Sequence, residues 1–193
     1  MKKIIGRILM AAGTVAVLAA LSLFIYNLRE AARADKNAQD VMDELADSIG
    51  ADGDWSDGRD TVLIDGYEYI GYVSIQELGL DLPVMAEWSY DRLKISPCRY
   101  TGDPGEGGFV ICAHNYSNHF GRLKELSEGD VIYFVEMDGE VWEYQVEAVE
   151  TLEPTAVEEM TDEGYDLTLF TCTYGGQSRV TVRCMLAEQT EEG

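Results

Sequence analysis

The sequence predicts a mostly β domain from about Thr61 onward, a barrel or sandwich of about seven or eight strands with short helices. Two observations lead to this prediction. Short apolar or β-branched runs recur between turn signals, and helix signals are sparse in the same region. The expected strands are Tyr69–Ile75, Leu82–Met85, Gly108–His114, Val131–Glu136, Glu140–Val149, Leu167–Cys172 and Arg179–Leu186.

The connections between these runs support the assignment. Asp138-Gly139 lies between two of the runs and is the dipeptide of a tight hairpin, so we expect Val131–Glu136 and Glu140–Val149 to pair. Single helical turns are expected at 122–126 and 154–160. The domain therefore has little helix of its own.

A hydrophobic helix is expected before the domain. Ile8–Tyr26 is an uncharged run of 19 residues, close to the roughly 20 that span a bilayer. Lys2, Lys3 and Arg7 precede it, so the positive-inside rule places the N-terminus in the cytoplasm and the domain outside the cell. Ala32-Arg33-Ala34 resembles a signal-peptide cleavage site, but the apolar run exceeds the usual core of such peptides. We predict an uncleaved single-pass anchor in the cell membrane.

An amphipathic helix and a loop connect this anchor to the domain. Apolar residues recur at three- and four-residue steps from Ala34 to Ile49, as on one face of a helix. Residues 50–60 are rich in Gly and Asp and read as a loop. The expected organisation is a cytoplasmic tip and anchor over 1–28, helix and acidic linker over 29–60, and an extracellular domain over 61–193.

The charge distribution excludes one class of partner. The net charge is -22. Residues 1–36 hold six basic and two acidic side chains, which leaves 8 basic and 34 acidic side chains, net -26, over 37–193. Because phosphate backbones would be repelled, nucleic acid is not an expected partner.

The cysteine and histidine content argues against a metal site. The chain has four cysteines and two histidines, without CxxC or HExxH spacing. We expect no metal and no cofactor. The cysteines could form two disulfides in an extracellular protein, and their spacing does not decide whether they do.

One cysteine lies at the end of an expected strand. Leu167–Cys172 is followed by turn-forming residues and then by the strand that begins at Arg179. A tight connection would bring the Arg179 guanidinium near the Cys172 sulfur, where it could stabilise an oxyanion formed by attack on a carbonyl. Arg183 shares the face of Arg179 and is a reserve candidate, although an ion-pair role suits it better.

A histidine ends another expected strand. His114 closes Gly108–His114, and beside Cys172 it would supply an imidazole acid/base to a thiol nucleophile. Each residue also has a structural interpretation. Buried cysteines commonly serve packing, which is the role expected for Cys98, Cys112 and Cys184.

The combination resembles the sortase family. TLFTC at 168–172 matches the family's TLxTC signature, and RVTVR at 179–183 looks like the strand that carries its catalytic arginine. AHN at 113–115, followed by Phe120, Gly121 and Leu123, is similar to the family's histidine segment. The order His, Cys, Arg agrees, and the resemblance covers about 71–186.

The resemblance implies a sortase-like closed β-barrel and a cysteine transpeptidase. Cys172 would be the nucleophile, His114 the acid/base and Arg179 the oxyanion stabiliser, with Thr171 helping to bind substrate. The implied partners are sorting-signal peptides of secreted proteins and an amine acceptor such as a peptidoglycan precursor or a pilin lysine.

The subclass and two alternatives stay open. Ala113 replaces the family's usual glycine, and 149–166 is short for class B, so class B-like and class D-like assignments both remain, with LPxTG-like or NPxTx-like signals. An L,D-transpeptidase has Arg two residues after Cys, whereas here the interval is seven. A non-catalytic extracellular binding module, with Cys172 in the core, is the other alternative.

Overall fold

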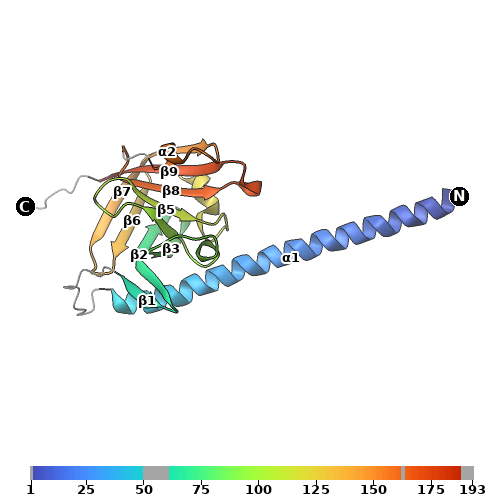
Figure 1. Ribbon diagram of the computed structural model, residues 1–193, viewed down its shortest axis with the longest axis horizontal. Coiled ribbons are helices and arrows are strands. Elements are labelled where there is room, and N and C mark those ends of the chain that lie inside the picture. The colour runs from blue at the N-terminus through green and yellow to red at the C-terminus, as the bar shows by residue number, and fades with distance from the viewer. Residues whose placement is uncertain (1, 50–60, 162–163, 188–193) are drawn as a thin grey trace, which may run out of the picture. The chain divides into compact units, whose positions relative to one another are not determined.

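The computed structural model describes residues 2–49, 61–161 and 164–187. It divides into two compact units, Met1–Arg33 and Ala34–Gly193 (Figure 1). The linker expected over residues 50–60 lies outside the described residues, so the helix-to-domain connection stays a prediction.

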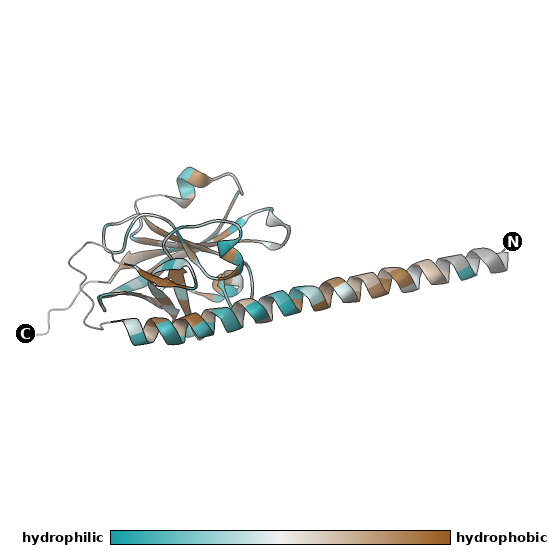
Figure 2. Ribbon diagram, turned by 60° about the horizontal axis from the view of Figure 1, so that its bottom comes forward, coloured by the Kyte–Doolittle hydropathy of each residue, from teal (hydrophilic) through white to brown (hydrophobic). Residues whose placement is uncertain are grey.

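The first unit is the N-terminal part of helix α1 (Lys2–Ser48). Apolar side chains such as Leu18, Leu21 and Phe24 are exposed along it. Within the described residues, α1 is the one helix long and apolar enough to cross a membrane, and Figure 2 shows hydrophobic colouring concentrated in its first part. A hydrophobic helix is thus present where the sequence predicts one.

The rest of α1 belongs to the second unit and packs on it. Ala34, Ala38, Val41 and Leu45 are buried, and Val41 and Leu45 join a hydrophobic cluster that includes Tyr69. This confirms the expected amphipathic helix. The second compact unit begins at Ala34, because this helical face covers part of the domain's apolar surface.

The second unit contains one nine-stranded sheet that closes on itself. The sheet order is β1-β2-β3-β4-β5-β8-β9-β7-β6, and β2 also pairs with β6, so eight strands form a closed mixed barrel. The strands are β1 (Val62–Ile64), β2 (Tyr67–Ile75), β3 (Leu80–Met85), β4 (Cys98–Thr101), β5 (Phe109–Ala113), β6 (Val131–Glu136), β7 (Val141–Leu152), β8 (Leu167–Cys172) and β9 (Arg179–Leu186).

Helices in the barrel domain are short. They are α2 (Val157–Met160) and the 3-10 turns Gln76–Leu78, Arg92–Lys94, Phe120–Glu125 and Tyr174–Gly176. The barrel prediction is confirmed, and all seven expected strands are present. The hairpin prediction is confirmed too: Val135 pairs with Val141, and Gly139 takes a φ of 93°, a region that glycine enters without steric cost.

The barrel has a packed interior that fixes which way each strand faces. Ile111, Phe134, Leu169 and Val182 point into one cluster, where Phe109 meets Phe134 edge to face with ring centroids 5.0 Å apart. Alternate residues such as Val110 and Phe170 join the second cluster, on the other face of the sheet. Core packing therefore sets which side of the barrel wall each residue of β5, β8 and β9 faces.

Candidate active site

The candidate nucleophile and arginine face each other across one hairpin. Cys172 and Arg179 are direct partners in the antiparallel pairing of β8 and β9. The connection is closed by Thr173, whose N–H donates to the Ser178 carbonyl over 2.9 Å, and Gly175 and Gly176 have φ of 80° and 70°. The sequence folds back this tightly because glycines occupy the left-handed positions. Cys172 is exposed.

The histidine comes from the strand on the other side of β8. β5 runs parallel to β8 with Ala113 opposite Thr171, and the Thr171 hydroxyl donates to the Ala113 carbonyl over 2.8 Å. His114 and Cys172 each follow directly after this pair. Parallel strands in register end at the same edge of the sheet. The three predicted catalytic residues therefore leave three neighbouring strands at one end of the barrel.

The imidazole of His114 is held by its neighbours in sequence. Its ring stacks on Tyr116, with centroids 4.3 Å apart and planes 4° from parallel. The Asn115 backbone N–H donates to Nδ1 over 3.2 Å. The side-chain Oδ1 of Asn115 also lies 3.2 Å from Nδ1. In the imidazolium form both ring nitrogens carry protons, so Nδ1 can donate to this oxygen and the Nε2–H can protonate a leaving amine.

The guanidinium of Arg179 is attached to its own turn. Nη1 donates to the carbonyls of Gly176 and Ser178, both over 3.2 Å. The Arg179 side chain is half-buried, and its hydrogen bonds to the described residues use Nη1 alone. Because Arg carries five N–H donors, others can meet an oxyanion. Arg179 and Cys172 line one pocket.

This pocket is mostly apolar. Its volume is about 190 Å³. The floor comes from β5 and β8, and two loops make the walls: the β3–β4 connection and the β7–β8 connection. Besides Cys172 and Arg179, its lining residues are Trp88, Tyr90, Leu93, Tyr100, Cys112, Ala113, Pro154, Val157, Met160 and Phe170. Such a pocket suits the apolar side chains of an extended peptide.

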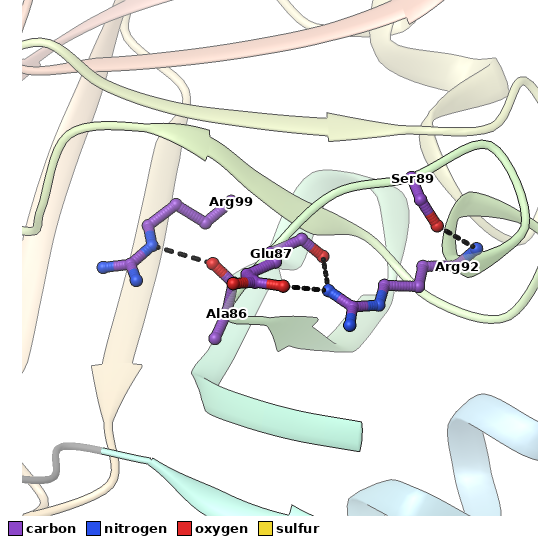
Figure 3. Close-up of polar contacts among 5 residues, drawn as sticks. All are labelled: Ala86, Glu87, Ser89, Arg92 and Arg99. Atoms are coloured by element: carbon purple, nitrogen blue, oxygen red, sulfur yellow. Dashed lines mark hydrogen bonds and ion pairs between the residues drawn. The ribbon is translucent and has the colours of Figure 1, made fainter. Parts of the chain in front are cut away.

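Two arginines organise the β3–β4 wall (Figure 3). Arg92 donates through Nη1 to the Glu87 carboxylate over 2.8 Å and to its carbonyl over 3.2 Å. Arg99 Nε donates to the Ala86 carbonyl over 3.0 Å. These bonds bridge the segment that carries the pocket residue Trp88. The wall is therefore shaped before a ligand arrives.

A third arginine anchors the β7–β8 wall. Arg183 is 2% exposed. Its Nε meets the Glu150 carboxylate at 2.7 Å, and its other nitrogens donate to the Thr168 hydroxyl and to the carbonyls of Glu159 and Met160. The expected ion-pair role of Arg183 is confirmed, and its donors are directed to the connection that supplies Met160 to the pocket.

The remaining cysteines are core residues, as predicted. Cys98, Cys112 and Cys184 are buried free thiols. Burial raises the pKa of Cys98 to about 12 and also raises the pKa of Cys112 and of Cys184 above the ordinary thiol range. A thiol held protonated in this way is a poor nucleophile. Cys172 differs from all three because its sulfur is exposed.

Thr171 is 3% exposed and is not among the residues that line the pocket, and its hydroxyl donates to the Ala113 carbonyl. Sequence reasoning missed most of the pocket walls. Trp88 and Tyr90 lie outside any regular element, and β4, which contributes Tyr100, has four residues. The one available signal was the aromatic run Trp88-Ser-Tyr90 between two strands.

Comparison with known proteins agrees with this architecture. A sortase domain family matches residues 73–187. Sortase A from Corynebacterium diphtheriae is similar at 25% identity over 66% of this chain and 64% of that chain, with a TM-score of 0.59. Sortase C1 from Streptococcus suis is 30% identical over 65% of this chain and 76% of that one, with a TM-score of 0.57.

Two further comparisons bear on the fold and the sequence. The Clostridium perfringens sortase D5 transpeptidase shares the fold at 19% identity over 81% of this chain and 99% of that one, with a TM-score of 0.62. A search of curated proteins found no match. Solved structures of sortases A, C and D are thus all similar, and they leave the subclass open. From the matched domain, the barrel and its strand-end residues, the chain belongs to the sortase family of cysteine transpeptidases.

Proposed function

We propose that this chain cleaves a sorting signal of secreted proteins through a thioester on Cys172 and transfers the acyl group to an amine. The observation that carries the proposal is the strand register. Cys172 lies opposite Arg179 on β9, and Cys172 and His114 each directly follow the paired residues Thr171 of β8 and Ala113 of β5. The pocket that begins at Cys172 supplies a binding site for the peptide.

The first half-reaction uses all three side chains. The Cys172 thiolate attacks the carbonyl carbon of the scissile peptide bond, and the carbonyl oxygen becomes an oxyanion. The Arg179 guanidinium stabilises that charge in the transition state. The carbon–nitrogen bond then breaks, and His114 gives its proton to the departing amine. The products are a thioester on Cys172 and a free amine.

The second half-reaction reverses these roles. An acceptor amine attacks the thioester carbonyl, His114 removes the proton from the attacking nitrogen, and the Cys172 sulfur leaves as thiolate. The acceptor is a peptidoglycan precursor or a pilin lysine. LPxTG-like and NPxTx-like signals are the two substrate classes to compare.

The membrane arrangement is part of the same proposal. The apolar run of α1 serves as an uncleaved single-pass anchor, with Lys2, Lys3 and Arg7 on the cytoplasmic side and the barrel outside the cell. The support is the length and composition of the helix. An anchored enzyme would meet secreted substrates as they leave the membrane.

The test is a peptide panel. Full-length protein in detergent micelles is incubated with LPxTG-like and NPxTx-like peptides, with and without an amine acceptor, and products are identified by mass spectrometry. The proposal predicts a ligated product for one peptide class, lost in the Cys172→Ala variant. Absence of both cleavage and ligation for every peptide would contradict it.

A further inference from the structure

A second recess adjoins the catalytic pocket. Its volume is about 480 Å³, against about 190 Å³ for the catalytic pocket. Trp88 and Tyr100 line both. The recess is completed by Thr101, Gly102, Gly107, Gly108 and Thr161. A peptide that fills the first pocket can therefore continue into the second across these two aromatic rings.

The boundary between the two spaces is a packed aromatic cluster. Trp88 and Tyr100 lie 5.4 Å apart between centroids with planes tilted by 31°, and Tyr100 meets Phe170 edge to face at 5.4 Å. Arg92 and Arg99 bind Glu87 and Ala86, the two residues before Trp88 in the chain (Figure 3). Because the backbone before Trp88 is held and the rings pack on one another, the passage is preformed, which lowers the ordering cost of binding.

The recess also offers a strand edge. β3 pairs with β4 at one described position, Met85 with Cys98. From Arg99 to Thr101, β4 pairs with β5 along one edge, and no described strand pairs with its other edge. A strand edge without a partner strand presents backbone N–H and C=O groups to an extended peptide. Tyr100 and Thr101 of this edge line the recess.

The charge around the recess is acidic. Asp103 and Glu106 lie in the turn between the lining residues Gly102 and Gly107, and Glu158 and Glu159 precede Thr161 in the chain. Asp103 is paired with Arg99. The region 37–193 as a whole carries a net charge of -26. A cationic segment is favoured here over an anionic one.

The chemistry of the site sets the direction of the peptide. The acyl half of the substrate stays on Cys172, so it occupies the apolar pocket, while the amine half departs on the side of His114. The chain that precedes the signal can then leave the pocket past Trp88 and Tyr100, because these two residues line both spaces.

We propose that this recess binds the polypeptide segment immediately preceding the sorting signal, as an extended strand carrying lysine or arginine. The direction assigned to the segment rests on the proposed function. The recess would add affinity and select among secreted substrates that share one signal.

The kinetic test compares three peptides with full-length protein in micelles: the short signal of whichever class is cleaved, the same signal preceded by six residues that include two lysines, and a version with glutamates in their place. We expect the lysine extension to raise kcat/KM about tenfold, equivalent to one or two added backbone hydrogen bonds. We expect the glutamate version to give no gain. Equal kcat/KM for all three peptides would overturn the proposal.

A matched pair of variants locates the effect. Thr101 is exposed and lines the recess but not the catalytic pocket. Thr101→Trp should place a bulky ring in the recess, abolish the gain from the extension and leave kcat/KM for the short signal unchanged, whereas Thr101→Val should keep the gain. If Thr101→Trp retains the gain, the segment binds elsewhere and the proposal is wrong.

A binding assay separates this inference from the proposed function. Fluorescein-labelled short and extended peptides of both signal classes are titrated with full-length Cys172→Ala protein in micelles, and anisotropy is measured. Tighter binding of a lysine-extended peptide, reversed by Thr101→Trp, supports the recess even if no turnover is seen. Turnover of the short signal, together with equal affinities for the short and extended peptides, would refute the recess proposal and leave the proposed function standing.

Discussion

Strands β8 and β9 contribute to two regions that differ sharply. At their open end, Cys172 is exposed and Arg179 is half-buried, with a guanidinium bonded to two carbonyls of its own turn. Four residues further along β9, Arg183 is 2% exposed and bonded to a carboxylate, a hydroxyl and two carbonyls. The same residue type on the same face of one strand has two different environments.

The difference shows how this barrel divides its tasks. Arg183 in the middle of β9 binds the β7–β8 connection, so substitutions there should lower stability and loosen the pocket wall. Cys172 and Arg179 at the strand ends are more exposed, so substitutions there should lower the chemical rate and leave the fold intact. Four predictions test this division.

The largest effect is expected at Cys172. Cys172→Ala removes the nucleophile, so transpeptidation should fall by roughly 10⁴-fold or more, while the thermal unfolding temperature stays within error because the sulfur is exposed. Cys184→Ala is the matched control, since it removes a buried thiol and should lower stability while activity persists. Activity retained in Cys172→Ala, measured as ligated product, would remove the assignment.

The next effect is expected at Arg179. Arg179→Ala removes an oxyanion donor, which should lower kcat by about 10²–10³-fold with little change in KM. Arg179→Lys should recover part of the rate, because a cation returns without the planar fork. Steady-state kinetics with the cleaved peptide measure both. A rise in KM with kcat unchanged would show that Arg179 holds substrate instead.

A smaller and different effect is expected at Arg183. Arg183→Met should lower the free energy of unfolding by about 2 kcal/mol, because buried carbonyls lose their donor. KM should rise about fivefold, since ordering a loosened wall costs on the order of 1 kcal/mol. Glu150→Gln, which keeps the shape, should change both quantities less. A large fall in kcat at fixed KM would assign Arg183 the oxyanion role after all.

The smallest effect is expected at Thr171. Thr171→Val removes the hydroxyl bond to the Ala113 carbonyl, at a cost of about 1 kcal/mol in unfolding free energy. The positions of His114 and Cys172 relative to each other should become less fixed, so kcat should fall about threefold to tenfold. Thr181→Val is a control on the neighbouring strand β9, because the buried Thr181 hydroxyl has no hydrogen-bond partner among the described residues. Unfolding in urea and peptide kinetics separate the two effects.

Much of the fold could be predicted because local patterns determine it. The expected strands carry strong period-two signals, and Asp138-Gly139 marks its hairpin unambiguously. The Cys172–Arg179 pairing follows from two strand ends joined by a short glycine turn. Strands β1 and β4 were missed because they are only three and four residues long, too short to show an alternating pattern.

The pocket could not be predicted because it depends on tertiary contacts. The burial of Arg183 requires the Glu159 and Met160 carbonyls, which the sequence does not place beside β9. The position of Trp88 depends on Arg92 and Arg99 holding a loop of irregular backbone. Such contacts arise only when the barrel closes.

The most direct test of the central claim is to map the trapped acyl-enzyme. Full-length protein is incubated with the cleaved peptide without an amine acceptor, quenched in acid, digested and analysed by tandem mass spectrometry. The account predicts an acyl group on Cys172, and none on the buried thiols Cys98, Cys112 and Cys184. An acyl group on any other residue would contradict the account. Peptide turnover without a detectable acyl-enzyme, in both the wild type and the slower Arg179→Ala variant, would contradict it as well.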